Sequence, residues 1–267
     1  MKLADSEKRE LLDVANALAD AGREVTLKYF RTDGLQADNK DAAAYDPVTR
    51  ADREAELAIR AILETRRPDD GILGEEFPDK PTKSGLTWVI DPIDGTRAYI
   101  SGNPSWGILI GLDDGNGPIL GMVDQPYIGE RFIGGFGKSE MLRGETTRPL
   151  KTSPNTDLSD AILFTTFPEL GTDAERIAFE AVRDQVRLTR YGLDCYAYML
   201  LAMGQIDIVI EAGLHPFDIQ GPIGVIEAAG GIVTNWQGKP VHMGGQILAA
   251  GNATIHAKAL KILGKSS

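Results

Sequence analysis

The sequence predicts a layered α/β protein with two closely packed sub-domains, and three features of the chain indicate this. Residues 6–65 carry apolar side chains at the three- and four-residue spacing of helices. Short β-prone runs then dominate to about residue 136. Past residue 150, single strands alternate with single helices. We therefore predict an N-terminal sub-domain, 1–150, made of a helix pair and a strand-rich sheet, and a C-terminal α/β sub-domain, 151–267.

The N-terminal half supplies a helix pair followed by strands. Apolar residues recur every three or four positions over 6–30, and Ser6 is a suitable N-cap for this first helix. A break at 45–49 precedes a second helix that extends to about Thr65. The strand-like runs that follow are separated by Gly, Asp, Asn and Pro, and they lie at 71–74, 88–90, 106–112, 119–124 and 131–133.

The C-terminal half alternates strands with helices. Pro216 suits the first turn of a helix, and the pair Gly230-Gly231 suits its end. The predicted strands lie at 162–166, 186–191, 206–211 and 247–250. The predicted helices lie at 173–182, 195–203, 216–229 and, after the last strand, to about 263. The Gly-rich tracts at 134–137 and 244–245 match no phosphate-binding loop, and we predict that they are turns.

The charge balance and the cysteine content limit the class of protein. With 28 basic and 39 acidic side chains the net charge is −11, which disfavours binding to the phosphates of DNA or RNA. Only Cys195 is present, so we expect no disulfide within the chain and a reducing cytoplasm as its setting. No run approaches the roughly 20 apolar residues that span a bilayer, and 2–7 is polar rather than signal-like. We expect a soluble cytoplasmic protein that binds neither nucleic acid nor membrane.

The segment Asp91-Pro92-Ile93-Asp94-Gly95-Thr96 carries the most chemical information in the chain. An apolar, β-prone run delivers two carboxylates to a turn that proline makes rigid, because the ring fixes φ and removes an N–H donor. Two aspartates held on one turn repel each other unless a cation lies between them. Oxygen ligands followed by the backbone amides of Gly-Thr suit a divalent metal ion with a phosphate beside it. The residues alone therefore indicate metal-assisted phosphate chemistry.

The same segment closely resembles the metal-binding signature of the inositol monophosphatase superfamily, the lithium-sensitive, Mg²⁺-dependent phosphatases. Further matches occur in the family's order along the chain. They are Asp46-Pro47-Val48-Thr49-Arg50-Ala51-Asp52, Gly74-Glu75-Glu76, and Phe217-Asp218 followed by Glu227-Ala228-Ala229-Gly230-Gly231. The resemblance covers about residues 46–231. It implies the family's alternating α/β/α/β/α layers and usually a homodimer.

The resemblance also implies roles for individual residues. The implied metal ligands are Glu75, Asp91, Asp94, Asp218 and the backbone carbonyl of Ile93. The implied catalytic residues are Glu75, Asp46 and Thr96, of which the last two look like the pair that orients the attacking water. The amides of Gly95 and Thr96 would hold phosphate oxygens. The implied cofactor is Mg²⁺, as two or three ions, with Mn²⁺ as a possible substitute, because these ions prefer oxygen ligands.

Some of these acidic residues also have a purely structural explanation. Asp46 precedes a proline and could be the N-cap of the second helix. Asp218 could complement the dipole at the start of its helix. Glu75 could be an ordinary surface charge. Each of these explanations is compatible with the sequence, so the geometry of the fold has to decide among them.

Three stretches indicate which phosphate ester is bound. They resemble the histidinol-phosphate phosphatase branch of the superfamily, and they lie at 97–107, 191–198 and 211–219. Histidinol phosphate carries an ammonium group and an ionisable imidazole, whereas inositol phosphate carries no cation. Asp194 and Glu211 would favour the amine through charge-assisted hydrogen bonds, although Asp194 could instead cap a helix. Arg97 would meet either the substrate or the metal-binding carboxylates.

We therefore predict a Mg²⁺-dependent phosphomonoesterase that converts L-histidinol phosphate and water to L-histidinol and phosphate, a step of histidine synthesis. Water would attack phosphorus in line, without a covalent enzyme intermediate. An inositol-1-monophosphatase or a related sugar-phosphate phosphatase is the alternative within enzymes. A regulatory protein that keeps this fold and acts by binding another protein is the alternative outside them.

Overall fold

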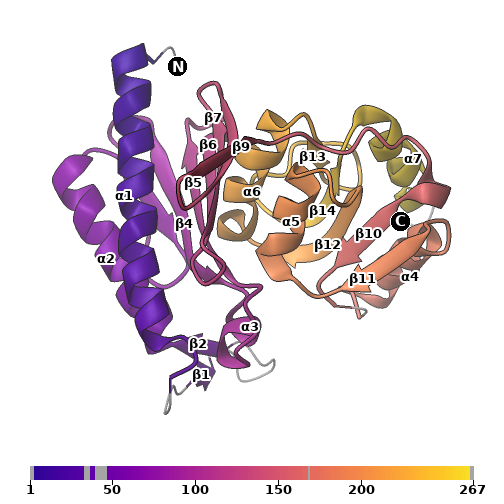
Figure 1. Ribbon diagram of the computed structural model, residues 1–267, viewed down its shortest axis with the longest axis horizontal. Coiled ribbons are helices and arrows are strands. Elements are labelled where there is room, and N and C mark those ends of the chain that lie inside the picture. The colour runs from indigo at the N-terminus through magenta and orange to yellow at the C-terminus, as the bar shows by residue number, and fades with distance from the viewer. Residues whose placement is uncertain (1–2, 33–36, 40–46, 168, 265–267) are drawn as a thin grey trace.

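Five alternating layers of helices and sheets make up the structure, a computed structural model that describes residues 3–32, 37–39, 47–167 and 169–264 (Figure 1). Two helices cover the outer face of a seven-stranded sheet. Two more lie between this sheet and a five-stranded sheet, and a last pair covers the far face of the second sheet. The predicted α/β/α/β/α layering is confirmed, and its physical basis is that it covers both faces of both sheets.

The outermost layer is the antiparallel pair α1 (Asp5–Tyr29) and α2 (Arg50–Arg66). The buried side chains of α1 follow the helical period, and Leu11, Val14 and Leu18 are fully buried. They pack with α2 against one face of the seven-stranded sheet and form a continuous apolar cluster. This cluster fixes the position of the first turn of α2, which contributes to the site described below.

The N-termini of these two helices differ from the prediction. The N-cap of α1 is Ala4, whose side chain makes no capping hydrogen bond, so Ser6 lies inside the first turn and does not cap the helix. The N-cap of α2 is Thr49, which forms a capping box with a carboxylate three residues later. Thr49 thus occupies the cap position, and Asp46, the residue considered for it from the sequence, lies outside the described residues.

The seven-stranded sheet forms the second layer. Its strands are β3 (Gly71–Gly74), β4 (Thr87–Asp94), β5 (Gly107–Asp113), β6 (Pro118–Gln125), β7 (Glu130–Gly135), β8 (Lys138–Arg143) and β9 (Thr146–Pro149). They lie in this order, with β3 parallel to β4 and the other neighbours antiparallel. The sequence pattern did not predict β8 and β9, because most of their side chains are polar and all four residues of β9 are exposed.

The middle layer consists of α5 (Asp194–Ala202) and α6 (Pro216–Ala228). Residues 219–226 of α6 are buried, and the helix lies directly on the strands β5, β6 and β7. At Gly121 and Gly134, a Cβ atom would lie 2.2 Å from a carbonyl oxygen of α6. Gly134 is therefore a strand residue that lets the helix approach the sheet, and the predicted turn at that position is wrong.

The five-stranded sheet lies beyond the middle layer. Its strands are β10 (Ile162–Thr165), β11 (Leu188–Tyr191), β12 (Ile208–Leu214), β13 (Ile232–Thr234) and β14 (Gly245–Ala250). Their spatial order is β11-β10-β12-β14-β13, in which β10 is parallel to β11 and β12, and β14 is antiparallel to both its neighbours. The pattern did not predict the three-residue strand β13.

The outer face of this second sheet is covered by α4 (Asp173–Arg183) and α7 (Ala253–Leu263). Near the site, β1 (Ala37–Asn39) and β2 (Pro47–Thr49) form a small antiparallel pair, and the short helix α3 (Thr96–Ile100) follows β4. The two large sheets are separate along the chain. The division into sub-domains at residue 150 stays a prediction.

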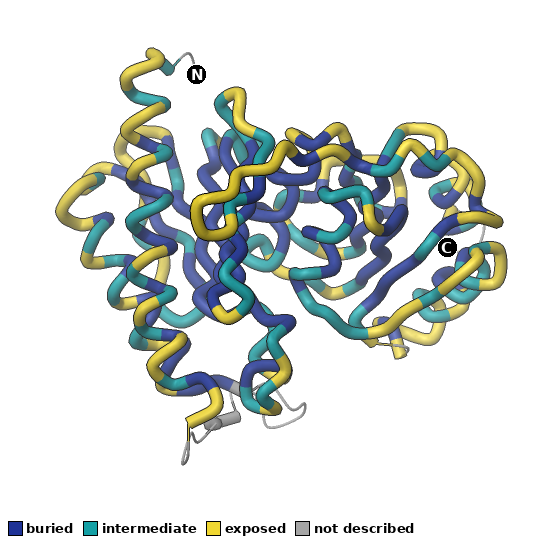
Figure 2. Tube along the Cα trace, viewed as in Figure 1, coloured by how far each residue is buried: buried dark blue, intermediate teal, exposed yellow. Residues whose placement is uncertain are grey.

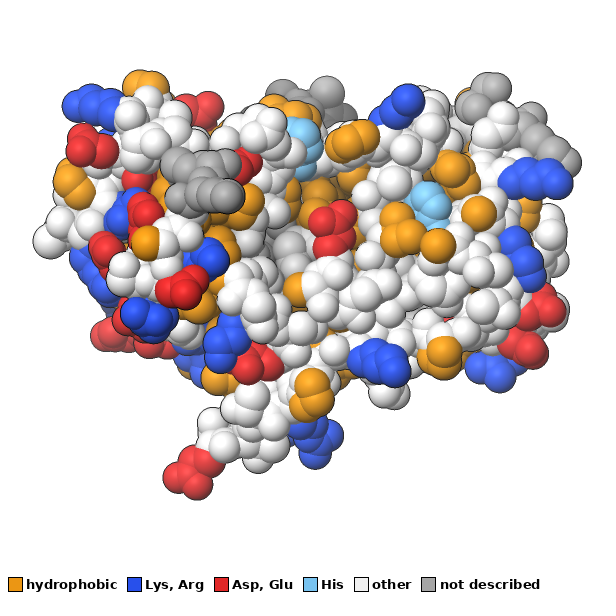
Figure 3. Space-filling model, turned by 90° about the horizontal axis from the view of Figure 1, so that it is seen from above, with side chains coloured by type: hydrophobic (Ala, Val, Ile, Leu, Met, Phe, Trp, Pro, Cys, Tyr) orange, Lys and Arg blue, Asp and Glu red, His pale blue; other side chains and the backbone are white. Residues whose placement is uncertain are grey.

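Burial is concentrated in the two sheets and in the helix layer between them (Figure 2). On the face shown in Figure 3, acidic and basic side chains are interspersed around the edge rather than segregated by sign. Within the described ranges, no helix has the length and the apolar character needed to cross a membrane.

Candidate active site

The two aspartates of the predicted metal-binding turn lie at the end of β4. Asp91 pairs with Leu109 of β5, and Asp94 pairs with Gly107. From Asp91 to Asp94 the chain of β4 advances three residues, whereas β5 advances only two, so β4 contains a bulge of one residue. Side chains alternate across a strand, so without this one-residue bulge the two carboxylates would point to opposite faces. The N–H of Ile93 donates to Oδ1 of Asp91 at 2.9 Å and holds the turn. The bulge thus brings both carboxylates to one side.

Asp218 reaches the same place from the first turn of α6. Its Oδ2 accepts the N–H of His215, the N-cap residue, at 2.6 Å. A negative charge is also favoured by the dipole at this helix end, which agrees with the structural explanation of Asp218, and its role as a metal ligand stays a prediction. One carboxylate oxygen from each of Asp91, Asp94 and Asp218 lies within 4.8 Å of the others.

The three carboxylates concentrate negative charge where little water enters. Asp91 is only 2% exposed. Its burial, followed by the charges of Glu75, Asp94 and Asp218, holds its pKa well above the ordinary value. Burial and the charge of Asp218 also raise the pKa of Asp94, although the N–H of Cys195 donates to Asp94 Oδ2 at 2.7 Å and acts in the other direction. A set of oxygen donors that repel one another fits a hard divalent cation such as Mg²⁺.

The hydroxyl of Thr96 connects this turn with α2. It lies 3.2 Å from the carbonyl oxygen of Ile93 and 3.4 Å from Oδ1 of Asp52. Asp52 is fully buried, and its other oxygen accepts the N–H and the hydroxyl of Thr49 at 2.8 and 2.5 Å. Burial raises the pKa of Asp52 to about 6 against these hydrogen bonds. Asp46, the predicted partner of Thr96, lies outside the described residues.

Gly95 and Asp194 are packed against each other beside the turn. Gly95 has φ 84°, and a Cβ at this position would lie 2.8 Å from the carboxyl carbon of Asp194. Oδ2 of Asp194 accepts the hydroxyl of Ser105 at 2.6 Å. The N-cap of α5 is Leu193, so the helix-capping explanation of Asp194 is wrong. Burial raises the pKa of Asp194, and the bond from Ser105 and the charge of Arg97 act in the other direction.

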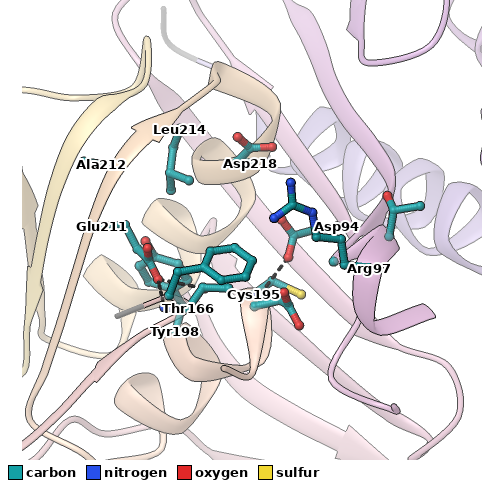
Figure 4. Close-up of a pocket in the computed structure, with 13 residues that line it drawn as sticks. Asp94, Arg97, Thr166, Cys195, Tyr198, Glu211, Ala212, Leu214 and Asp218 are labelled. Carbon is teal, nitrogen blue, oxygen red and sulfur yellow. Dashed lines mark hydrogen bonds between the residues drawn. The ribbon is translucent and has the colours of Figure 1, made fainter. Parts of the chain in front are cut away.

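A pocket of about 300 Å³ opens beside the three carboxylates (Figure 4). Asp94 and Asp218 line one part of it, and Glu211 of β12 lines another. Burial raises the pKa of Glu211 to about 7, although it accepts several hydrogen bonds. At the pocket wall, the Arg97 guanidinium lies over the ring of Phe167, 5.1 Å from its centre. The pocket therefore joins the carboxylate cluster to a second acidic region.

The structure brings most of the predicted site residues around this one pocket. Those that line it are Asp94, Gly95, Thr96, Arg97, Asp194, Glu211 and Asp218. Asp91 belongs to the carboxylate cluster, Glu75 lies close enough to raise its pKa, and the carbonyl of Ile93 faces Thr96.

Sequence reasoning missed three polar residues that hold members of the site. They are Asp52, which approaches Thr96, Ser105, which donates to Asp194, and Thr166, which donates to Glu211. Only Asp52 left a signal in the sequence, because Thr49 and Asp52 have the spacing of a capping box. The other two act across 89 and 45 positions of the chain, which no local pattern reveals.

This five-layer fold, with a pocket beside clustered carboxylates, fits a phosphatase of the layered α/β class. The profile of the Inositol monophosphatase family matches residues 7–267, so the chain belongs to this family. It is 42% identical to the bifunctional phosphatase IMPL2, chloroplastic, of Arabidopsis thaliana, over 98% of this chain and 77% of that one. It is 34% identical to a histidinol-phosphatase of Mycobacterium tuberculosis, over 93% and 96%.

A solved structure shows the same fold. An inositol monophosphatase from Zymomonas mobilis superimposes with a TM-score of 0.81 at 37% identity, covering 98% of this chain and all of the other. The resemblance to this family, inferred from four short motifs, is therefore confirmed over nearly the whole chain.

The contact between Asp52 and Thr96 leads to a test of the catalytic role predicted for the Thr96 hydroxyl. Asp52→Asn keeps one oxygen acceptor for the N–H of Thr49 but removes the charge that orients the hydroxyl of Thr96. We expect kcat to fall about 10- to 100-fold while KM changes little, because misoriented catalytic groups cost rate rather than binding. Steady-state kinetics would measure this. Asp157→Asn, which alters an exposed cap remote from the pocket, is the matched control, and an unchanged kcat in Asp52→Asn would contradict the role.

Proposed function

We propose that this protein hydrolyses L-histidinol phosphate to L-histidinol and inorganic phosphate. The main support is one observation: the pocket beside the carboxylate cluster contains two further acidic side chains, Asp194 and Glu211. A phosphate ester whose leaving alcohol carries a cation matches this distribution of charge. The similarity to a histidinol-phosphatase supports the same substrate.

We also propose that Asp91, Asp94, Asp218 and Glu75 hold Mg²⁺, together with the carbonyl of Ile93. The all-oxygen donor set and the mutual repulsion of the aspartates support this ion. When bound, Mg²⁺ would supply positive charge that offsets the charge of the phosphoryl group and makes a nearby water more acidic.

The side chains and backbone amides beside the carboxylate cluster would orient the attacking water and hold the phosphate. Oγ1 of Thr96 would accept a hydrogen bond from the attacking water and donate its own proton to Oδ1 of Asp52, 3.4 Å away. The backbone amides of Gly95 and Thr96 would hold phosphate oxygens at the start of α3. The water oxygen forms the new bond to phosphorus, the bond to the ester oxygen breaks, and the alcohol oxygen takes up a proton.

Asp194 and Glu211 would select the alcohol part of the substrate. Both are mostly removed from water, so a salt-bridged hydrogen bond to an ammonium group would be stronger there than at an exposed surface. Inositol 1-phosphate offers only hydroxyl groups to the same two carboxylates. Binding it would leave their charge without a cation, which is unfavourable in a buried pocket.

The test is turnover of L-histidinol phosphate and inositol 1-phosphate, side by side, with Mg²⁺. We expect kcat/KM to favour L-histidinol phosphate by at least about 100-fold, because a site built for a charged group discriminates strongly against a substrate that lacks it. Glycerol 2-phosphate, which also lacks a cation, controls for general phosphatase activity. A preference for either neutral ester would refute the proposed substrate.

Inositol 1-phosphate is the second candidate, and the structural similarity to the inositol monophosphatase of Zymomonas mobilis favours it. Glu211 could accept hydrogen bonds from inositol hydroxyls, so this residue alone does not separate the two substrates. Asp194 does, because its charge adds nothing essential to the binding of a neutral alcohol. The homodimer remains a prediction from the family resemblance.

A further inference from the structure

Glu211 is held by an unusual concentration of hydrogen-bond donors at the end of β10. Its Oε1 accepts the N–H of Thr166 at 2.6 Å and the hydroxyl of Thr166 at 2.8 Å. Its Oε2 accepts the hydroxyl of Thr165 at 3.3 Å. The carboxylate is only 6% exposed, yet it lines the pocket beside the carboxylate cluster. Figure 4 shows Thr166 and Glu211 joined on the side of the pocket away from Asp94.

The register of the second sheet produces this arrangement. β10 and β12 are parallel neighbours, with Leu163 opposite Ile208 and Phe164 opposite Val209. The same offset of 45 residues places Thr166, which directly follows β10, opposite Glu211 of β12, beside the pocket. Carboxyl ends of parallel strands are the common location of ligand sites, because side chains and free backbone groups converge there.

The hydrogen bonds have a definite electrostatic consequence. Donors that point at a carboxylate stabilise its charged form, whereas burial favours the neutral form. Burial is the larger effect here, so Glu211 is an acid whose ionisation depends on each donor. No group on α5 stabilises the charge of Glu211 in place of the threonine donors. Asp194 carries a like charge, and the Tyr198 hydroxyl has no hydrogen-bond partner among the described residues. The opposing residue on β14 is the apolar Ile247.

We infer that Thr166 is a positioning residue that orients the Glu211 carboxylate in the pocket wall, and that it thereby sets how strongly the proposed acidic subsite binds a cationic nitrogen of the substrate's alcohol part. This inference rests on the proposed function for the identity of that alcohol. Thr166 acts through Glu211 and does not itself contact the reacting phosphate. The subsite would discriminate between cationic and neutral alcohols. An ionised, buried carboxylate is stable only beside a cation, whereas a protonated carboxyl group would bind neutral alcohols equally well.

The experiment removes only the hydroxyl of Thr166. Thr166→Val keeps the volume and the backbone N–H bond, and Thr166→Ala is the second variant should the first not fold. We expect the KM for L-histidinol phosphate to rise about tenfold with kcat within about twofold, as for one lost hydrogen bond to a charged group. Thr166→Ser, which restores the hydroxyl, should return KM to near the wild-type value. Thr165→Val removes the longer bond and should raise KM less than Thr166→Val does.

A second measurement separates this inference from the proposed function. L-histidinol, which carries the cation but no phosphate, should inhibit hydrolysis of p-nitrophenyl phosphate, and Thr166→Val should raise its inhibition constant about tenfold. The KM for p-nitrophenyl phosphate itself should stay within about twofold, since this ester has no cation. If wild type fails to hydrolyse L-histidinol phosphate but shows this inhibition pattern, the proposed substrate is wrong and the cationic subsite stands.

Three results would overturn the inference itself. The first is an unchanged KM and inhibition constant in both Thr166→Val and Thr166→Ala. The second is an equal loss with L-histidinol phosphate and p-nitrophenyl phosphate, which would make Thr166 a residue of general structural importance. The third is a wild-type enzyme that L-histidinol does not inhibit.

Discussion

Asp94→Asn should abolish activity and, at the same time, make the metal-free protein more stable. Asp94 is surrounded by Asp91, Asp218 and Asp194, and its pKa is raised by burial and by the charges of Asp218 and Asp194. Asparagine keeps an oxygen that can accept the N–H of Cys195, so the local structure should survive. We expect kcat to fall at least about 1000-fold, since the residue is a proposed Mg²⁺ ligand at the reacting phosphate.

The stability change follows from the like charges that remain when no cation is bound. We expect Tm in EDTA to rise by about 2 to 4 °C, the equivalent of roughly 1 kcal/mol in a protein of this size. Because the pKa of Asp94 is higher in the folded than in the unfolded chain, the folded state binds more protons. Metal-free wild type should therefore lose stability as pH rises from about 4, and Asp94→Asn should lose less.

Thermal melts with EDTA and with Mg²⁺ measure both effects. Mg²⁺ should raise the Tm of wild type, because it binds the folded state, and should raise that of Asp94→Asn much less. Asp124→Asn is the control: Asp124 is fully buried, whereas Asp94 is partly buried, but Asp124 is paired with Arg23 and Arg131, so its neutralisation should lower Tm in both buffers and leave kcat nearly unchanged. A lower Tm for metal-free Asp94→Asn, or activity within tenfold of wild type, would contradict the proposed metal cluster.

Asp194→Asn should convert a selective enzyme into an unselective one. Asp194 has φ 47°, a conformation that asparagine tolerates as well as aspartate, and its amide oxygen can still accept the hydroxyl of Ser105. The substitution thus removes the charge and little else. We expect kcat/KM for L-histidinol phosphate to fall about 10- to 100-fold, as for the loss of a hydrogen bond between charged groups.

The same variant should hydrolyse glycerol 2-phosphate within about threefold of the wild-type rate, because no cation of this ester meets Asp194. Steady-state kinetics on both esters provide the measurement. Ser105→Ala is the companion variant: it keeps the charge but removes the donor, so its effect on L-histidinol phosphate should be smaller. Equal losses on the two esters would show that Asp194 supports the turn at Gly95 rather than the substrate.

The order of helices and strands could be predicted wherever side chains alternate between buried and exposed positions with a regular period. α1, α2, α4 and α7 were found within a few residues of their boundaries, because each has one buried face. α5 and α6 were also found within one residue of their bounds, although much of each helix is buried, and the pattern failed for elements that are short or mostly polar. β8 and β9 are mostly polar, β13 has three residues, and α3 has five.

The amino-acid pattern was sufficient to identify the family and to single out Asp91, Asp94 and Asp218, because short motifs place carboxylates beside proline and glycine in a recognisable order. It could not show that a bulge in β4 turns two of them to one side. Nor could it pair Thr166 with Glu211 or Ser105 with Asp194. Those contacts join residues that are distant along the chain, and the register of the sheets and the packing of α5 decide which of them meet. The sequence shows which chemical groups the chain carries, whereas only the folded structure shows which of these groups lie close together.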